Sequence, residues 1–161
     1  MYSTATHARD ARLVAEVLAG VAAPTLFIIR SGDFLFGGFA SDQWQFEGDR
    51  FGTPKSFLFS LTLDVKVPFH GRRKDAESKL FPADGRGGVQ HDCLRGVADH
   101  DDASLRWGLH DLVLHGDLSR CTSEIEFSYG FGLPADSNEA KALLAGASVF
   151  AVDSMEVWSV V

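Results

Sequence analysis

A period-two pattern of apolar residues in the first third of this chain constrains its fold more than any other feature. Residues 25–30 (TLFIIR) and 34–40 (FLFGGFA) flank a turn at 31–33 that contains a glycine. Alternating apolar runs joined by a short glycine turn predict a β-hairpin. Glycine weakens a strand interior, so Gly37 and Gly38 indicate either a bulge or the close approach of another backbone or ring.

The same alternation predicts further strands. It is clearest over residues 56–63 (SFLFSLTL), where Phe57, Phe59, Leu61 and Leu63 are expected on one face. Other strands are expected at residues 105–109, 112–115, 148–152 and 155–160, with a kink at Gly108. Residues 64–104 contain no pattern that places a strand with certainty.

Two short helices are expected near the two ends of the chain. Residues 10–18 carry an apolar stripe made of Leu13, Val14, Val17 and Leu18, and a glycine and a proline follow it. Residues 138–145 follow a proline and precede a glycine, which is typical of a short helix. The loop at 42–55 carries Trp44, Phe46 and Phe51 and is expected to pack against the core.

The size and aromatic content of the chain narrow the fold class. Its 161 residues and 17.5 kDa suit one domain with a real core. The 13 phenylalanines and three tryptophans favour a sheet-rich core. We therefore expect a β-dominated α+β fold, built as a two-sheet antiparallel β-sandwich with short peripheral helices.

The charge and cysteine content exclude several classes of function. A formal net charge of −7 and a pI near 5.2 oppose binding to nucleic acid or to an anionic membrane surface, but they suit a protein partner with a basic patch. No apolar run approaches the ~18 residues of a membrane span, and the N-terminal residues lack the layout of a signal peptide. Two cysteines are too few for a disulfide scaffold, which indicates a cytoplasmic protein with free thiols.

Several short motifs occur in an order that points to one family. They are Tyr2-Ser3, Phe36-Gly37-Gly38-Phe39, Gly52, Ser56-Phe57-Leu58-Phe59-Ser60-Leu61, Asp111-Leu112, Ser128-Tyr129 and Met155-Glu156-Val157-Trp158. With these motifs the chain resembles the TLDc domain, the module of the oxidation-resistance protein family. The resemblance covers most of the chain and is consistent with a single TLDc-like domain over residues 1–161. We interpret Tyr2, Ser3, Gly52 and the phenylalanines and glycines of these motifs as structural residues.

The resemblance is incomplete in places. The family domain usually carries a helical segment upstream of the Tyr-Ser motif, whereas this sequence starts at that motif. Residues 69–104 match poorly, and the glycine-rich strand usual in the second half is not obvious. We expect either a divergent version of the domain or a piece of a longer protein. Partner binding that depends on a C-terminal tail is in doubt, because the sequence stops at Val161.

What the family is known for supplies the expected function. The resemblance implies a β-sandwich flanked by small helices, and it implies a non-enzymatic protein-interaction domain linked to protection against oxidative stress. Several family members bind the vacuolar proton-pumping ATPase and regulate its assembly, so subunits of that pump are the leading expected partner. One alternative is a structural subunit of a large cytoskeletal or ciliary assembly. Another is a weak thiol-based peroxide-handling protein.

Possible metal ligands gather between residues 110 and 121. His110, Asp111, His115, Asp117 and Cys121 are residue types that ligate zinc. However, His110 and His115 are five residues apart on an expected strand, which would direct them to opposite faces. We therefore interpret this segment as a polar strand edge and turn, and expect no metal and no cofactor.

The two cysteines are the candidates for thiol chemistry. Arg95 lies near Cys93, and Arg120 precedes Cys121. A reactive thiol needs a lowered pKa and exposure, whereas free cysteine is usually buried, so we expect inert thiols. Residues 91–93 (HDC) also form a second, equally weak candidate for metal binding.

Other catalytic motifs are missing from the sequence. There is no nucleophile-elbow motif, and residues 85–88 (GRGG) lack the Lys-Ser/Thr pair of a phosphate-binding loop. We interpret residues 85–88 as a turn and the basic triplet 72–74 (RRK) as a solvated loop. No catalytic residue is expected.

The last expected strand supplies the candidate for partner binding. Alternation places Glu156 and Trp158 on the face opposite Met155 and Val157. One interpretation is a carboxylate that faces a partner beside an aromatic anchor. The other is a carboxylate that completes a polar network at the rim of the sandwich, and the sequence leaves both open.

Overall fold

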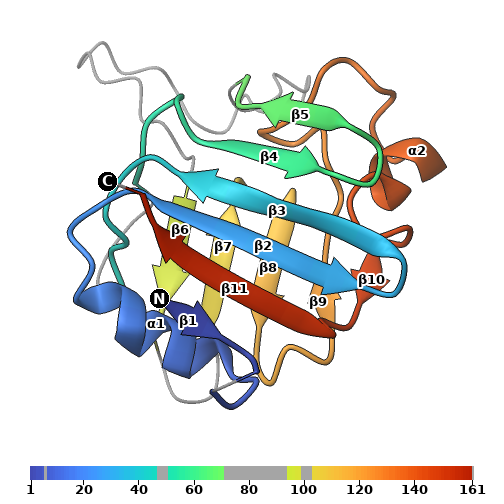
Figure 1. The fold of residues 1–161 in the computed structure, drawn as a ribbon. Coiled ribbons are helices and arrows are strands. Elements are labelled where there is room, and N and C mark those ends of the chain that lie inside the picture. Colours follow the sequence, from blue (N-terminus) through green and yellow to red (C-terminus); the bar gives the residue numbers. More distant parts are fainter. Residues whose placement is uncertain (6, 47–50, 71–93, 99–102, 161) are drawn as a thin grey trace, which may run out of the picture.

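Two antiparallel sheets face each other and enclose the core (Figure 1). The computed structural model describes residues 1–5, 7–46, 51–70, 94–98 and 103–160. Within these residues two short helices accompany the sheets, so the expected β-dominated sandwich is confirmed. Neither helix has the length and apolar character that crossing a membrane requires, as far as the described residues go.

The larger sheet has six strands in the order β1-β11-β2-β3-β4-β5. Their bounds are Tyr2–Ser3 for β1, Ser154–Ser159 for β11, Thr25–Ser31 for β2, Phe34–Ala40 for β3, Phe57–Ser60 for β4 and Val65–Pro68 for β5. The last strand of the chain, β11, therefore lies between the first two (Figure 1). Every neighbouring pair in this sheet is antiparallel.

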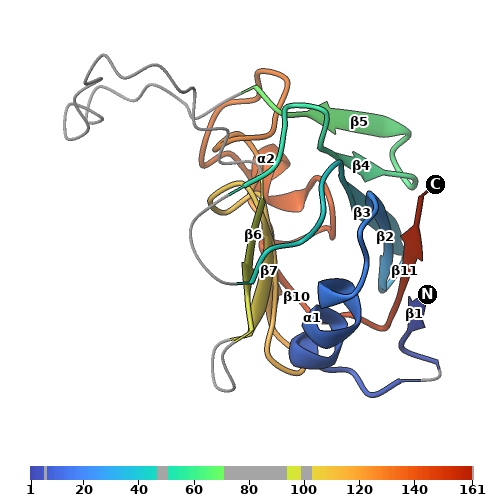
Figure 2. The same cartoon turned by 90° about the vertical axis from the view of Figure 1, so that its left-hand side faces the viewer.

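The smaller sheet has five strands in the order β10-β9-β8-β7-β6. Their bounds are Val149–Phe150 for β10, Cys121–Thr122 for β9, Leu112–His115 for β8, Ser104–Trp107 for β7 and Leu94–Val97 for β6. Figure 2 shows this sheet as a separate layer that faces the larger one.

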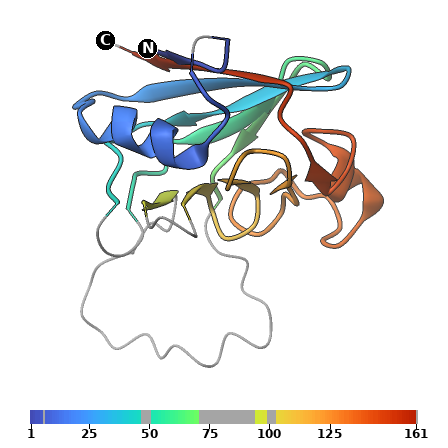
Figure 3. The same cartoon turned by 90° about the horizontal axis from the view of Figure 1, so that it is seen from below.

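Both expected helices are present, with polar N-caps. The first, α1 (Ala11–Ala19), begins after Asp10, whose side chain accepts a hydrogen bond from the Arg12 N–H over 2.8 Å. It lies between the two sheets at one end of the sandwich and packs beside β7 (Figures 2 and 3). The second, α2 (Asn138–Ala142), begins after Ser137 and is shorter than the expected 138–145.

The glycine pair of β3 is explained by close approach rather than by a bulge, because pairing of β3 with β2 is continuous. A Cβ at Gly38 would lie 2.5 Å from Cε2 of Trp107 on the facing sheet. A Cβ at Gly37, on the other face of β3, would collide with the carbonyl oxygen of Phe27 and with the ring of Phe59. Each glycine thus makes room for a neighbour that any side chain would displace.

Aromatic rings fill the space between the sheets. The ring of Trp107 lies edge-on to Phe27 at 4.8 Å and to Trp44 at 5.2 Å between centroids. Trp44 is buried and donates from its indole nitrogen to the hydroxyl of Thr25 over 2.9 Å. Phe51 is buried as well, so the expectation that the 42–55 loop packs on the core is confirmed for these residues.

Several strand boundaries differ from the expectation; the strand expected over 148–152 is reduced to 149–150, and the one expected over 155–160 is observed at 154–159. The strand expected over 56–63 ends at Ser60, and residues 61–64 form a turn in which Asp64 has a φ of +53°. Leu61 and Leu63 continue the apolar alternation but are 55% and 49% exposed. The hairpin between β2 and β3 closes with two turn residues rather than three, because Ser31 still pairs with Phe34.

Four strands were not anticipated from the pattern. β5 and β6 lie in the 64–104 stretch where no strand could be placed, and β1 and β9 have two residues each. β7 ends at Trp107, and Gly108, with a φ of +65°, opens a four-residue turn instead of a kink. The candidates at 72–74, 85–88 and 91–93 lie outside the described residues.

Candidate functional site

In the part of the chain that the structure describes, the larger sheet has one face without a covering helix. Neither α1 nor α2 lies over the side turned away from the smaller sheet, which we call the outer face (Figures 2 and 3). On the opposite side, inward residues such as Phe27, Phe36 and Leu58 are fully buried. Strand alternation therefore directs their sequence neighbours to the outer face.

The strand register arranges the outer face into cross-strand rows, and the shortest of them consists of Ser154, Arg30 and Leu35. One row consists of Trp158, Leu26, Phe39, Phe57 and Pro68, and we call it the apolar row. The next row consists of Glu156, Ile28, Gly37, Phe59 and Lys66, and we call it the charged row. The outer face is thus mostly apolar, with charges where the charged row reaches β11 and β5, and with the exposed Arg30 on β2 in the neighbouring row.

Aromatic side chains cover the β3–β5 part of the outer face. The rings of Phe39 and Phe57 stack with centroids 5.1 Å apart. The Lys66 ammonium lies over the Phe57 ring, 4.1 Å from its centroid. The ring of Phe59 lies across Gly37, which leaves Phe59 only 9% exposed.

The two candidate residues of β11 lie on this face. Met155 and Val157 are buried, whereas Glu156 is exposed and Trp158 is 39% exposed, as alternation along the strand predicts. The Trp158 indole nitrogen donates to the Glu156 carboxylate over 3.1 Å. The two side chains therefore form a single exposed unit with an aromatic surface and a negative charge.

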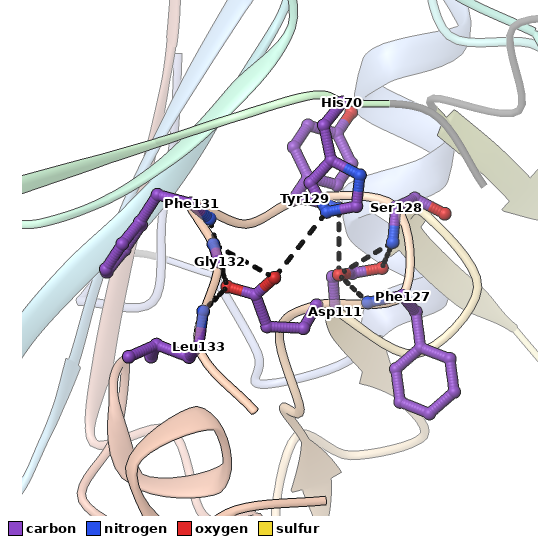
Figure 4. A network of polar contacts seen from close by, with 9 residues as sticks. His70, Asp111, Phe127, Ser128, Tyr129, Phe131, Gly132 and Leu133 are labelled. Carbon is purple, nitrogen blue, oxygen red and sulfur yellow. Dashed lines mark hydrogen bonds and ion pairs between the residues drawn. The ribbon is translucent and has the colours of Figure 1, made fainter. Parts of the chain in front are cut away.

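A second notable site is built around two carboxylates that hold one loop, residues 126–133 (Figure 4). Asp111 is fully buried, and Figure 4 shows its carboxylate among the backbone N–H groups of Phe127, Ser128 and Tyr129, at 2.9–3.1 Å. Burial raises the pKa of Asp111 to about 7, although these N–H donors lower it. Asp111 is therefore a buried hydrogen-bond acceptor that holds the backbone of residues 127–129 in place.

Glu126 holds the other half of the loop. Its Oε1 accepts N–H hydrogen bonds from Phe131, Gly132 and Leu133 over 2.9–3.1 Å (Figure 4). Its Oε2 lies 3.8 Å from His70 Nε2. Glu126 has a φ of +84°, a conformation that side-chain-bearing residues rarely adopt and that the surrounding hydrogen bonds must maintain.

His70 and Glu126 line a cleft of about 380 Å³ together with residues 130–133. Sequence reasoning missed both residues, because they come from segments 56 positions apart, as their numbers in the sequence give. The backbone brings them together, since the His70 N–H donates to the Ser128 carbonyl and the Gly130 N–H donates to Pro68. The one available signal was the acidic residue just ahead of the glycine-containing run 128–132 (SYGFG).

The residues considered as metal ligands have other contacts. His110 lies in the turn after β7, not on a strand as expected, and its ring packs edge-on against Phe127 with centroids 5.0 Å apart. Asp117 is exposed and accepts from the Ser119 N–H over 2.9 Å. Within the described residues, no group of three or more His, Cys, Asp or Glu side chains could hold a metal ion.

Cys121 lies on β9 and is fully buried. Burial raises the pKa of its thiol to about 11, so the reactive thiolate is disfavoured at neutral pH. Cys93, with His91 and Asp92, lies outside the described residues.

The motif residues at the N-terminal end have structural contacts. Tyr2 is buried, and its hydroxyl donates to the carbonyl of Ala8 over 2.6 Å. Ser3 pairs with Glu156 in the β1–β11 ladder. Gly52 has a φ of +100°, a conformation that favours glycine, in the loop before β4.

Comparison with known proteins gives one positive result. The sequence model described as the TLDc domain matches residues 1–161, the full length of this sequence. A search of the curated proteins found no match.

Proposed function

Because the chain belongs to the TLDc domain family, we propose that it is a non-enzymatic protein-interaction domain that docks on the vacuolar proton-pumping ATPase and regulates it. In this proposal the domain acts in the cytoplasm and contributes to protection against oxidative stress. The observation that carries the docking part is the outer face, with the exposed Glu156–Trp158 unit on its β11 side.

The chemistry of the outer face suits a protein partner. Tryptophan is among the residues that dominate interface energetics, because it buries a large rigid surface and still offers an N–H donor. Glu156 adds a negative charge beside it, and the chain as a whole carries −7. A partner with basic or polar patches would bind an acidic domain of this kind favourably. Such patches also steer the diffusional encounter of the two proteins.

Regulation follows if the domain prefers one state of its partner. A bound protein shifts a conformational equilibrium by its difference in affinity for the two states, and by no more than that. A domain that binds one state tenfold more tightly biases the equilibrium by about 1.4 kcal/mol. A docking domain can bias a large assembly in this way without catalytic groups of its own, and a larger preference gives a larger bias.

The two buried carboxylates favour the non-enzymatic interpretation. Asp111 is fully buried and Glu126 is 6% exposed, and each accepts several backbone N–H hydrogen bonds. Carboxylates used in this way fix a loop, and although Glu126 also lines the cleft beside His70, its Oε1 is already occupied by three backbone N–H groups. The Cys121 thiol is buried, and burial raises its pKa. Both limit its reaction with peroxide.

The test is binding of the purified chain to the purified peripheral sector of the vacuolar proton-pumping ATPase. Biolayer interferometry would compare the wild type with Glu156→Ala and Trp158→Ala, and with Glu139→Ala as a matched control, since Glu139 is exposed on α2. We expect saturable binding by the wild type and the control, and at least a tenfold loss for Trp158→Ala.

Two outcomes would contradict the proposal. Equal binding by all four proteins would remove the outer face from the docking site. Absence of binding by a folded wild-type chain, with far-ultraviolet circular dichroism as the check of folding, would remove the proton pump as partner. The structural-subunit alternative would then be tested with cytoskeletal assemblies.

A further inference from the structure

The outer face carries opposite charges at two positions of one cross-strand row. In the charged row Glu156 lies on β11 and Lys66 lies on β5, and beyond Glu156 the uncharged Ser3 of the edge strand β1 pairs with it. Three uncharged positions, Ile28, Gly37 and Phe59, lie between them. We propose that the outer face is self-complementary: two copies of this chain pack face to face, with Glu156 of each copy against Lys66 of the other.

The order of the strands in the larger sheet determines which two-fold axis brings Glu156 of one copy against Lys66 of the other. β3 is the middle one of the five strands from β11 to β5, and β1 lies outside them at the edge of the sheet. A two-fold axis that runs parallel to β3 between the two faces exchanges the β11 side of one copy with the β5 side of the other. Because Glu156 and Lys66 belong to the same row, they are at the same height along the strands and meet under this operation.

The alternative two-fold axis is disfavoured by the same charges. An axis perpendicular to the strands would place β11 of one copy on β11 of the other and β5 on β5. Glu156 would then face its own symmetry mate, and so would Lys66. Like charges that face each other across an interface are destabilising, so the charges select the first arrangement.

The apolar row supplies the contact between the charged ends. Two of its aromatic members, Phe39 on β3 and Phe57 on β4, already stack on each other. The two-fold axis would bring β3 over β3, so that Phe39 of one copy meets Phe39 of the other, and it would bring Phe57 of each copy over Leu26 of the other. Sheets that pack face to face in this way align their strands to within about 30°.

The width of the outer face limits the size of the contact and therefore the expected strength of association between the two copies. Five strands with a spacing of about 4.8 Å give a face about 20 Å wide, which is small for a protein interface. Small interfaces of this type are typical of reversible complexes. We therefore expect a monomer–dimer equilibrium that depends on protein concentration rather than a permanent dimer. This inference goes beyond the docking proposal and does not depend on it.

A charge exchange tests the inference. Sedimentation equilibrium of the full chain would be measured over a 100-fold range of concentration at low salt for the wild type, Glu156→Lys, Lys66→Glu and the double variant. For the wild type we expect the average mass to rise from 17.5 kDa towards twice that value. Each single variant should lose at least tenfold in association, and the double variant should regain it, because the ion pair is restored with reversed sign.

The control is Glu139→Lys, which makes the same charge change on α2, away from the outer face, and should associate like the wild type. Circular dichroism confirms that each variant is folded. A wild type that stays monomeric throughout overturns the inference and leaves the outer face to another partner. Single variants that dimerise like the wild type, or a double variant as weak as the singles, also overturn it.

Discussion

The indole nitrogen of Trp107 donates a hydrogen bond to the carbonyl oxygen of Phe39 over 3.3 Å, and so connects the two sheets through the core. Trp107 lies on β7 and Phe39 lies on β3. The same indole rests on Gly38, where a side chain would collide with it. The position of the Trp107 ring is therefore fixed by its hydrogen bond to Phe39, by the space that the absent Cβ of Gly38 leaves, and by contacts with its aromatic neighbours.

Substitution of Gly38 by alanine should destabilise the fold by about 1–3 kcal/mol, which is the usual cost of overpacking a core. Alanine also lowers the entropy of the unfolded chain, but that gain of about 0.4–1 kcal/mol is smaller. Urea unfolding would measure the change. The control is Gly20→Ala, because a Cβ there would meet only the Val17 carbonyl, at 3.9 Å. Equal stability of the two variants would contradict the role assigned to Gly38.

The stability of the fold should depend on pH through Asp111. Burial raises the pKa of Asp111 to about 7, from an ordinary value of 3.8, so the folded state binds this proton more tightly than the unfolded state does. The resulting stabilisation is complete below about pH 4 and is lost as the pH rises through 7. Each unit of pKa difference corresponds to about 1.4 kcal/mol.

The matched variant for this dependence is Asp111→Asn, which keeps an oxygen acceptor for the loop but does not titrate in this range. The difference in unfolding free energy, wild type minus variant, should fall as the pH rises from 4 to 7. Denaturant titrations at several pH values would measure it. A difference that stays constant over this range would show that Asp111 does not titrate there.

The loop at 126–133 should depend on the acceptor at Glu126. Glu126→Ala leaves the N–H groups of Phe131, Gly132 and Leu133 without their acceptor and should cost about 1–3 kcal/mol. Glu126→Gln keeps a carbonyl oxygen and should cost less. Because both variants retain the strained φ at residue 126, their difference isolates the hydrogen bonds. Hydrogen exchange at the Phe131 and Leu133 amides should accelerate in Glu126→Ala, and unchanged exchange would contradict this role.

The thiol of Cys121 should be unreactive in the folded chain. Its pKa of about 11, against an ordinary 9.0, lowers the thiolate fraction at pH 8 by about 100-fold, and burial limits access further. In a Cys93→Ser variant, labelling by a disulfide reagent should be at least 100-fold slower in buffer than in denaturant. Rapid labelling of the folded protein would reopen the thiol-based alternative.

The sequence pattern predicted the long strands and missed the short ones. β2 and β3 have seven residues each, so their alternation is unambiguous. β1 and β9 have two residues each, which is too few for any period to show. The strand expected over 56–63 was drawn too long because Leu61 and Leu63 continue the alternation on an exposed turn, where burial does not enforce it.

The candidate sites could likewise be predicted only where a local sequence pattern places their residues. Glu156 and Trp158 could be placed on one face because neighbours within a strand obey a local rule. The cleft of His70 and Glu126 depends on pairing between distant segments, which no local pattern encodes. The residues weighed as metal ligands at 110–121, where no metal was expected, are close in sequence, but Asp111 among them turns its carboxylate to the backbone at 127–129.

The position of β11 between β1 and β2 constrains the order in which the chain can fold. During synthesis the N-terminal strand emerges first, yet its partner in the sheet is made more than 150 residues later. Until residues 154–159 leave the ribosome, β1 has no ladder to join and one edge of β2 stays unpaired. An exposed edge of this kind is a site for aggregation. Completion of the larger sheet therefore has to wait for the synthesis of β11, and until then the edge of β2 that β11 will cover remains open to wrong partners.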